Sequence, residues 1–139
     1  MYLTFAEYQE MGGKLDETTF NDYGFEAQCK IDYYTFNRLK NETVIPENVK
    51  RLMYRLISLI DQIQKASIVD GISGDSSTTQ AGIASQSNDG VSISYNTLSA
   101  HDALDSLQTE IPKLVQQYLS GLTNSLGRKL LYRGLYPGE

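Results

Sequence analysis

The sequence PENVKRLMYRLISLIDQI, residues 46–63, decides the fold class of this chain. Apolar residues recur in it at steps of three and four, which is the spacing of one helix face. Pro46 fits the first turn of a helix, where the missing amide hydrogen would have no partner. We therefore predict a helix over residues 46–67, buried on more than one side because its apolar arc is wide. The apolar residues are Val49, Leu52, Met53, Leu56, Ile57, Leu59, Ile60 and Ile63.

Two helices are predicted before this one. Thr4 and Glu7 have the spacing of a capping box, which predicts a short helix over residues 4–11. A second apolar stripe predicts a helix over residues 17–39, in which Gly24 indicates a close approach of another helix. The stripe consists of Phe20, Tyr23, Ala27, Ile31 and Tyr34.

Helical spacing returns after residue 98, and Pro112 is expected to kink or divide the helix there. The predicted pieces are residues 99–110 and 112–122. The fold class is therefore mainly α, a single domain over residues 1–139 built as a small bundle of four to five helices.

A polar β-hairpin is predicted between the third and fourth helices, over about residues 82–95. Val91, Ile93 and Tyr95 alternate with serines, which is the spacing of a strand. The turn chemistry of Asn88-Asp89-Gly90 precedes them. A lone hairpin is marginally stable in water, so we expect this one to lie on another surface, such as a neighbouring subunit.

Composition excludes several classes of protein. The chain has 139 residues, 40% of them hydrophobic and 21% charged, which suffices for one packed domain. Its one cysteine and one histidine leave no disulfide framework and no multi-histidine metal site, so we expect neither metal nor cofactor. No apolar run approaches the length of a membrane span, and the first residues carry no cationic start of a signal peptide.

Charge is distributed unevenly along the chain. Residues 1–65 have a net charge of −2, and residues 113–139 a net charge of +3. The acidic stretch, residues 66–112, contains six acidic residues, no Lys and no Arg. The whole chain sums to −5, which argues against a general nucleic-acid binder. Either the acidic stretch is a solvated loop beside a basic end, or the two are surfaces that meet different partners.

The sequence contains few candidate catalytic residues. His101 and Asp102 are sequence neighbours, which do not face one another on a helix, so they do not form a catalytic pair by themselves. Cys29 falls within the second predicted helix and is interpreted as a small packing residue. We expect no enzyme activity.

The tail, residues 128–139, is too apolar for a free solvent segment and too rich in Gly and Pro for a helix. It is typical of a segment that docks on a partner or a neighbouring subunit. The candidate interface residues are Leu130, Leu131, Tyr132, Arg133, Leu135 and Tyr136. The candidate contact residues of the hairpin region are Asp75, Asp89, Val91, Ile93 and Tyr95.

Four pieces of the chain carry a resemblance: residues 2–8 followed by Gly12-Gly13, residues 31–39, residues 85–95, and residues 130–134. Together they resemble the head–tail connector proteins of long-tailed bacteriophages and prophages, also called adaptor or head-completion proteins. The resemblance covers nearly the whole chain in order.

The resemblance implies a small helical protomer that forms a ring, usually of twelve copies, beneath the portal of the viral neck. The ring would join head to tail, with the portal and a stopper or tail-completion protein as partners. DNA would pass through its channel without sequence-specific binding, and no catalysis, cofactor or membrane is implied. The protein would be made in the host cytoplasm and located in the virion.

Other interpretations remain open. A small helical adaptor or regulator could bind another protein through the tail, and a hydrolase built around His101 is a third, weaker possibility. Within the connector interpretation, residues 71–97 would contact neighbouring subunits or face the channel. Part of residues 70–102 is expected either to border the DNA path, where its acids would repel phosphates, or to remain a solvated loop.

Overall fold

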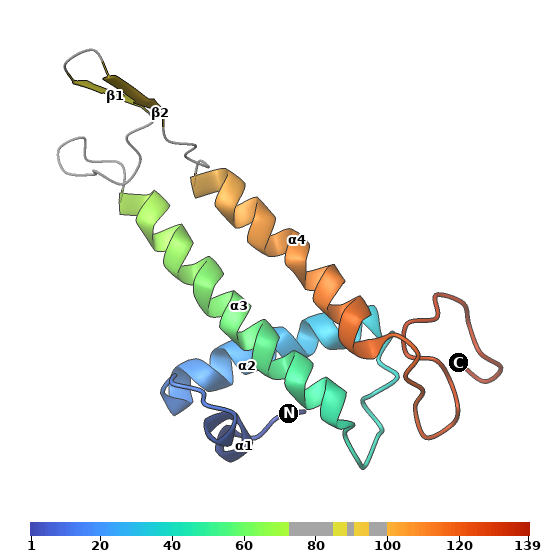
Figure 1. Cartoon of the computed structure of the whole chain (residues 1–139). Helices are drawn as coiled ribbons and strands as arrows, with labels where there is room; N and C mark the ends of the chain where they lie inside the picture. Colours follow the sequence, from blue (N-terminus) through green and yellow to red (C-terminus); the bar gives the residue numbers. More distant parts are fainter. Residues whose placement is uncertain (73–84, 89–90, 95–99) are drawn as a thin grey trace. The chain divides into compact units, whose positions relative to one another are not determined.

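The computed structural model describes residues 1–72, 85–88, 91–94 and 100–139 (Figure 1). The described chain is mainly α-helical, as predicted. Its helices are α1 (Phe5–Glu10), α2 (Glu17–Tyr34), α3 (Glu47–Ile72) and α4 (Ala100–Leu119). The chain forms two compact units, one of residues 1–61 and 110–139 and the other of residues 62–109. The boundaries between the units fall within α3 and within α4.

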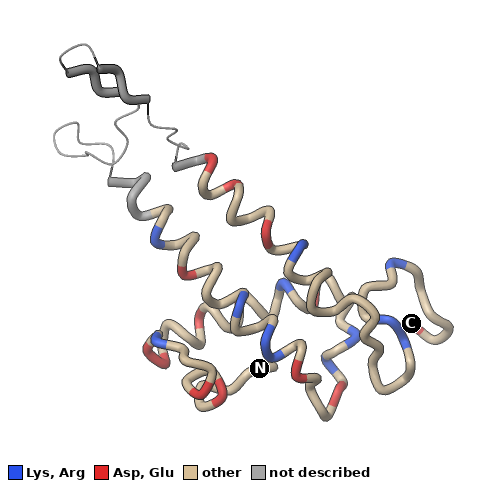
Figure 2. Tube along the Cα trace, in the orientation of Figure 1, with Lys and Arg blue, Asp and Glu red and all other residues tan. Residues whose placement is uncertain are grey.

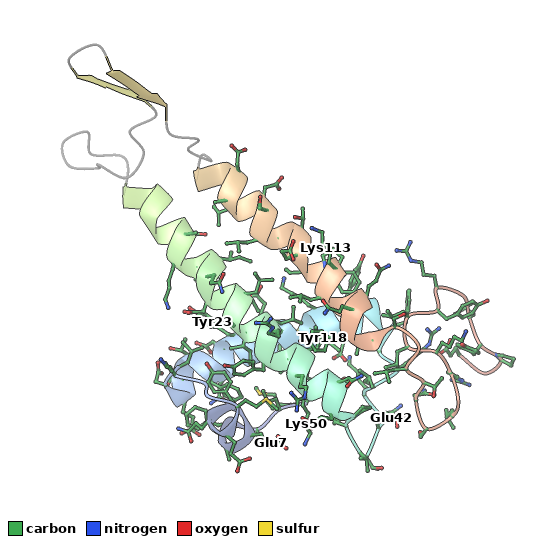
Figure 3. All side chains as sticks on the ribbon, in the orientation of Figure 1. Glu7, Tyr23, Glu42, Lys50, Lys113 and Tyr118 are labelled. Atoms are coloured by element: carbon green, nitrogen blue, oxygen red, sulfur yellow. The ribbon has the colours of Figure 1, made fainter. Side chains whose placement is uncertain are left out.

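The start of α1 has the predicted capping box. The Glu7 amide donates to Thr4 Oγ1 at 3.3 Å, and the Thr4 amide donates to Glu7 Oε2 at 2.9 Å. Glu7 also accepts a hydrogen bond from Lys50 on α3, which contributes most to lowering the pKa of Glu7 to about 2 (Figure 3). The first turn of α1 is thereby tied to α3 as well as capped.

The core of the first unit is built around the α3 face that the sequence predicted. Val49, Leu52, Met53, Leu56 and Ile57 are completely buried. Burying a large apolar side chain contributes about 1.5–3 kcal/mol, so this face supplies much of the stability of the unit. Other buried side chains in the unit are Leu3, Phe20, Ala27, Ile31, Leu39, Leu59, Ile60, Ile111, Val115, Leu119 and Leu130.

The expected division at Pro112 is wrong, because α4 continues through this residue. Proline inside a helix costs about 3 kcal/mol, since it removes one backbone hydrogen bond and crowds the preceding turn. Ile111 and Val115 on either side of Pro112 are both buried. Their burial offsets the cost and keeps the helix continuous until Leu119, after which Gly121 takes a positive φ of 80°.

Helix α3 also continues beyond its predicted end, to Ile72. The chain contains no glycine between residue 46 and residue 70, so nothing in the backbone interrupts the helix before Gly71.

Two strands belong to the second unit. The strand β1 (Ser85–Asn88) pairs antiparallel with β2 (Val91–Ser94), with Ser85 opposite Ser94 and Asn88 opposite Val91. The remaining residues of the predicted hairpin, including its turn at 89–90, lie outside the described residues. The polar hairpin over residues 82–95 therefore stays a prediction.

Candidate functional site

The turn after α2 sets up the candidate site. Phe36 and Asn37 have left-handed backbone conformations, with φ of 53° and 59°. This region is uncommon for residues with a side chain and especially so for a bulky ring. Helix α2 consequently ends at Tyr34, which corrects the predicted end at residue 39.

Local hydrogen bonds hold this turn. The Thr35 hydroxyl donates to the Ile31 carbonyl at 2.8 Å, and the Asn37 amide donates to the Asp32 carbonyl at 2.9 Å. The turn directs Arg38 into the protein, where only 3% of its side chain is exposed. A buried cation requires compensating partners, because leaving its charge unpaired costs several kcal/mol.

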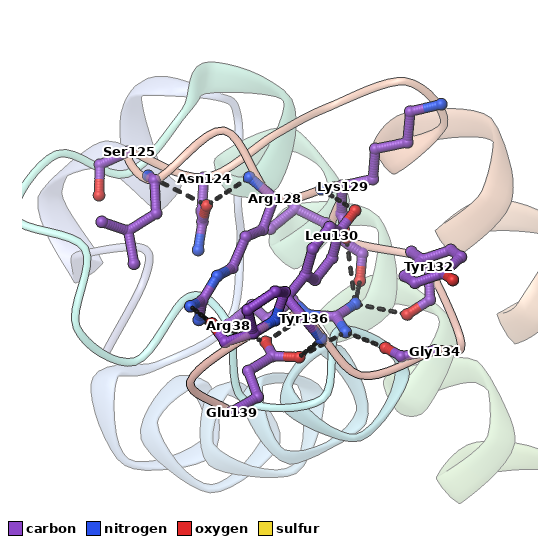
Figure 4. Close-up of polar contacts among 12 residues, drawn as sticks. Arg38, Asn124, Ser125, Arg128, Lys129, Leu130, Tyr132, Gly134, Tyr136 and Glu139 are labelled. Carbon is purple, nitrogen blue, oxygen red and sulfur yellow. Dashed lines mark hydrogen bonds and ion pairs between the residues drawn. The ribbon is translucent and has the colours of Figure 1, made fainter.

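Arg38 finds those partners in the tail (Figure 4). Its Nε and Nη2 donate to the two carboxylate oxygens of Glu139 at 2.8 and 3.1 Å. Its Nη1 and Nη2 also donate to backbone carbonyls of four tail residues, Lys129, Leu130, Tyr132 and Gly134. We call Arg38, these four residues and Glu139 the arginine clasp.

Two aromatic rings complete the surroundings of the guanidinium. The Arg38 Cζ lies 5.1 Å from the ring centre of Phe36 and 5.0 Å from that of Tyr136. Cation–π contacts at such distances stabilise a planar guanidinium better than a lysine ammonium, because guanidinium can stack. The Tyr136 ring also contacts that of Tyr132, with centroids 5.1 Å apart.

Electrostatics follow from this geometry. The hydrogen bonds from Arg38 contribute most to lowering the pKa of Glu139 to about 2, and the Tyr136 amide adds a further hydrogen bond at 3.0 Å. The hydrogen bond to Glu139 in turn raises the pKa of Arg38. Arg128 adds a second cation, with 3.6 Å between its Nη1 and Glu139 Oε1. The clasp is therefore fully ionised near neutral pH.

A groove with a volume of about 650 Å³ lies beside the clasp, between the end of α2, α4 and the tail. Tyr33 and Phe36 line it and remain 76% and 49% exposed. The full lining consists of Asp32, Tyr33, Tyr34, Phe36, Asn37, Pro112, Lys113, Val115, Gln116, Leu131 and Arg133.

Three charged residues line the groove. Asp32 is buried and accepts a hydrogen bond from the Tyr2 hydroxyl, whose pKa is raised mainly by burial, so this hydroxyl remains a donor. Lys113 is 67% exposed and pairs with Glu110 at 2.8 Å (Figure 3). Arg133 is exposed and makes no ion pair with any residue in the described part of the chain. The accessible charge of the groove is therefore mainly positive.

The predicted interface residues of the tail fall into different places. Leu130 is completely buried in the core of its own unit, which corrects its expected role on a docking surface. Tyr132 and Leu135 are 50% and 84% exposed. Leu131 and Arg133 line the groove. Tyr136 is half-buried, and its hydroxyl accepts from the Lys129 amide at 2.9 Å.

Only two of the predicted residues of the hairpin region lie in the described part of the chain. Val91 and Ile93 belong to β2, while Asp75, Asp89 and Tyr95 lie outside the described residues. Their expected contacts with subunits or with the channel remain predictions.

Sequence reasoning missed Arg38 and Glu139 as partners. They are 101 positions apart, so no local spacing could join them. The available signal in the sequence was that Arg38 stands beside the apolar Leu39, at the predicted end of a helix. Cys29 was interpreted as a packing residue, but it is exposed.

Comparisons with protein-family models, curated proteins and solved structures gave no match. Among residues 1–72 and 100–139, no helix is long and apolar enough to cross a membrane. The same described residues contain no cluster of His, Cys, Asp and Glu that could hold a metal ion.

Proposed function

We propose that this chain is a structural virion protein that forms a ring beneath the portal, joins head to tail and extends the DNA channel. The observation that carries the proposal is the exposed apolar surface of a small helical unit. Tyr33, Phe36, Tyr132 and Leu135 are all about half or more exposed, although the unit buries a full core. Large exposed apolar side chains next to a groove are typical of surfaces that bind other proteins.

The resemblance of the sequence to head–tail connectors supplies the rest of the proposal. The ring in that family usually has twelve copies, and a ring of identical chains uses one heterologous interface that closes on itself. The partners are further copies of the chain, the portal protein and a stopper or tail-completion protein. The protein performs no catalysis, is made in the host cytoplasm and resides in the neck of the virion.

In this proposal the inserted polar hairpin and the tail are contact elements. The hairpin, about residues 82–95, contacts neighbouring subunits or the channel. The tail contacts the portal or an adjacent subunit through Leu131, Tyr132, Arg133, Leu135 and Tyr136, while Leu130 anchors it to its own core. DNA passes the ring without sequence-specific binding.

Sedimentation velocity of the purified protein, alone and with the portal of its phage, tests the proposal. We expect a small species alone, and ring-sized complexes with the portal or at high protein concentration. A stable dimer that does not bind the portal contradicts the proposal.

A second candidate is a small helical adaptor that binds another protein through the tail. The 84% exposure of Leu135 favours the adaptor as much as the connector, because an exposed leucine can contact either a neighbouring subunit of a ring or a single partner protein. This candidate predicts a monomer or dimer under all conditions and no affinity for a portal.

A further inference from the structure

We propose that the groove beside the arginine clasp binds residues 66–109 of a second copy of this chain, the part of the acidic stretch that precedes Glu110. This contact rests on the proposed self-assembly and names the two parts of the chain that meet between subunits. The acidic stretch then contacts a neighbouring subunit and does not border the DNA path.

The groove has the size and the lining of a binding site for a protein segment. Its volume of about 650 Å³ falls within the usual range of ligand sites and accommodates several side chains. Tyr33, Phe36 and Leu131 provide apolar lining, while Asn37 and Gln116 provide hydrogen-bonding groups. Tyrosine is favoured at interfaces because it joins a large apolar area to a polar tip.

The charge of the groove indicates which kind of segment it binds. Lys113 and Arg133 both line the groove and are exposed, and Arg133 has no ionic partner in the described part of its own chain. The pair between Lys113 and Glu110 is exposed, so it is weak and exchangeable. The buried Asp32 already accepts a hydrogen bond from Tyr2. An occupant with several carboxylates would therefore complement the groove.

The chain itself contains such an occupant. Residues 66–109 of the acidic stretch contain five acidic residues and no Lys or Arg, while the sixth acid of the stretch, Glu110, pairs with Lys113. In the described part of α4 the acids Asp102, Asp105 and Glu110 precede Lys113, so the sign of the charge changes along this helix (Figure 2). Opposite charges on two surfaces favour association and fix its direction.

The contact is heterologous, because the groove and residues 66–109 are different parts of one chain. Each copy can then give its acidic stretch to one neighbour and receive that of another, which closes into a ring where the geometry allows.

Two full-length variants test the proposal. The groove-reversed variant carries Lys113→Glu and Arg133→Glu. The stretch-reversed variant carries Asp70→Lys, Asp75→Lys, Asp89→Lys and Asp105→Lys, which changes the net charge of residues 66–109 from −5 to +3. Sedimentation velocity at low salt measures the self-association of each, and circular dichroism verifies that each retains its helices.

We expect each variant alone to lose self-association at least tenfold, because its groove and its acidic stretch then carry the same sign. An equimolar mixture should regain association, since each variant complements the other. A matched control, Lys14→Glu with Arg55→Glu, reverses two exposed cations outside the groove and should associate like wild type.

The outcomes separate this inference from the proposed function. Wild-type association that neither variant weakens, or variants that do not recover when mixed, overturns the groove contact and leaves the ring proposal standing. Equal losses in the control and in the groove-reversed variant show a general charge effect and also overturn it. A wild-type protein that never self-associates, with or without portal, overturns both.

Discussion

Replacing Arg38 with alanine should release the tail from its own unit. The guanidinium donates six hydrogen bonds, two to Glu139 and four to tail carbonyls. Removing one partner of a buried ion pair costs about 3–5 kcal/mol. The tail can move and expose its carbonyls to water, so we expect the lower part of that range, about 3 kcal/mol. For a chain of this size the melting temperature should fall by roughly 10 °C.

Thermal unfolding followed by circular dichroism measures the loss, and trypsin reports on the tail directly. Cleavage after Arg128, Lys129 and Arg133 should accelerate in Arg38→Ala at temperatures where the helices remain folded. Arg38→Lys should have a melting temperature and a cleavage rate between those of the wild type and Arg38→Ala, since lysine retains the charge but not the planar guanidinium.

Arg51→Ala is the matched control, because Arg51 is 64% exposed and makes one surface pair with Glu47. It should cost less than about 0.5 kcal/mol. If Arg38→Ala and Arg51→Ala melt within about 1 °C of each other and cleave alike, the clasp does not hold the tail.

Three further predictions concern the tail and its charges. Deleting residues 131–139 should abolish portal attachment and leave the helices folded, whereas unchanged attachment would assign the tail to its own unit alone. The Glu139 carboxylate, whose pKa is lowered from 4.5 to about 2, stabilises the fold above pH 4.5 and loses this effect as the pH falls towards 2. Glu139→Gln should therefore show a weaker loss of melting temperature over that interval, and an unchanged acid profile contradicts the clasp. Leu130→Ala should lower the free energy of unfolding by about 2–5 kcal/mol, because Leu130 is completely buried. Leu135→Ala should change it little, because Leu135 is exposed, and urea unfolding measures both variants.

The core of the fold could be predicted from sequence where local patterns determine it. The face of α3 follows from apolar periodicity, and the capping box of α1 from two residues three positions apart. At Gly24 a close helix was expected, but a Cβ there would lie 3.0 Å from Sδ of Met1, which precedes α1, and 3.9 Å from Ile57 Cδ1 on α3. Each of these features depends on a short-range pattern or on one residue type.

The clasp could not be predicted in the same way. It depends on a left-handed turn at Phe36 and Asn37, which is uncommon for a bulky ring such as that of Phe36 and is held by the surrounding hydrogen bonds. Continuity at Pro112 likewise depends on the burial of Ile111 and Val115, which outweighs the local preference of proline. Sequence patterns report local preferences, and both features are cases where packing overrides them.

The acidic stretch has two possible roles, and they predict opposite outcomes in one experiment. If its acids border the DNA path, Asp75→Lys and Asp89→Lys should still permit rings, because the subunit contact lies elsewhere. Packaged DNA should then crosslink to residues 70–102, and its release should slow in a way that added salt relieves, since lysine attracts phosphates.

If the acids instead occupy the groove of a neighbour, the same substitutions should weaken the ring before any DNA enters it. Particles should then assemble poorly, and residues 70–102 should give crosslinks to Arg133 of an adjacent copy rather than to DNA. The groove supports this second role, because Arg133 lines it with no ionic partner in the described part of its own chain. Intact rings with DNA crosslinks would refute it.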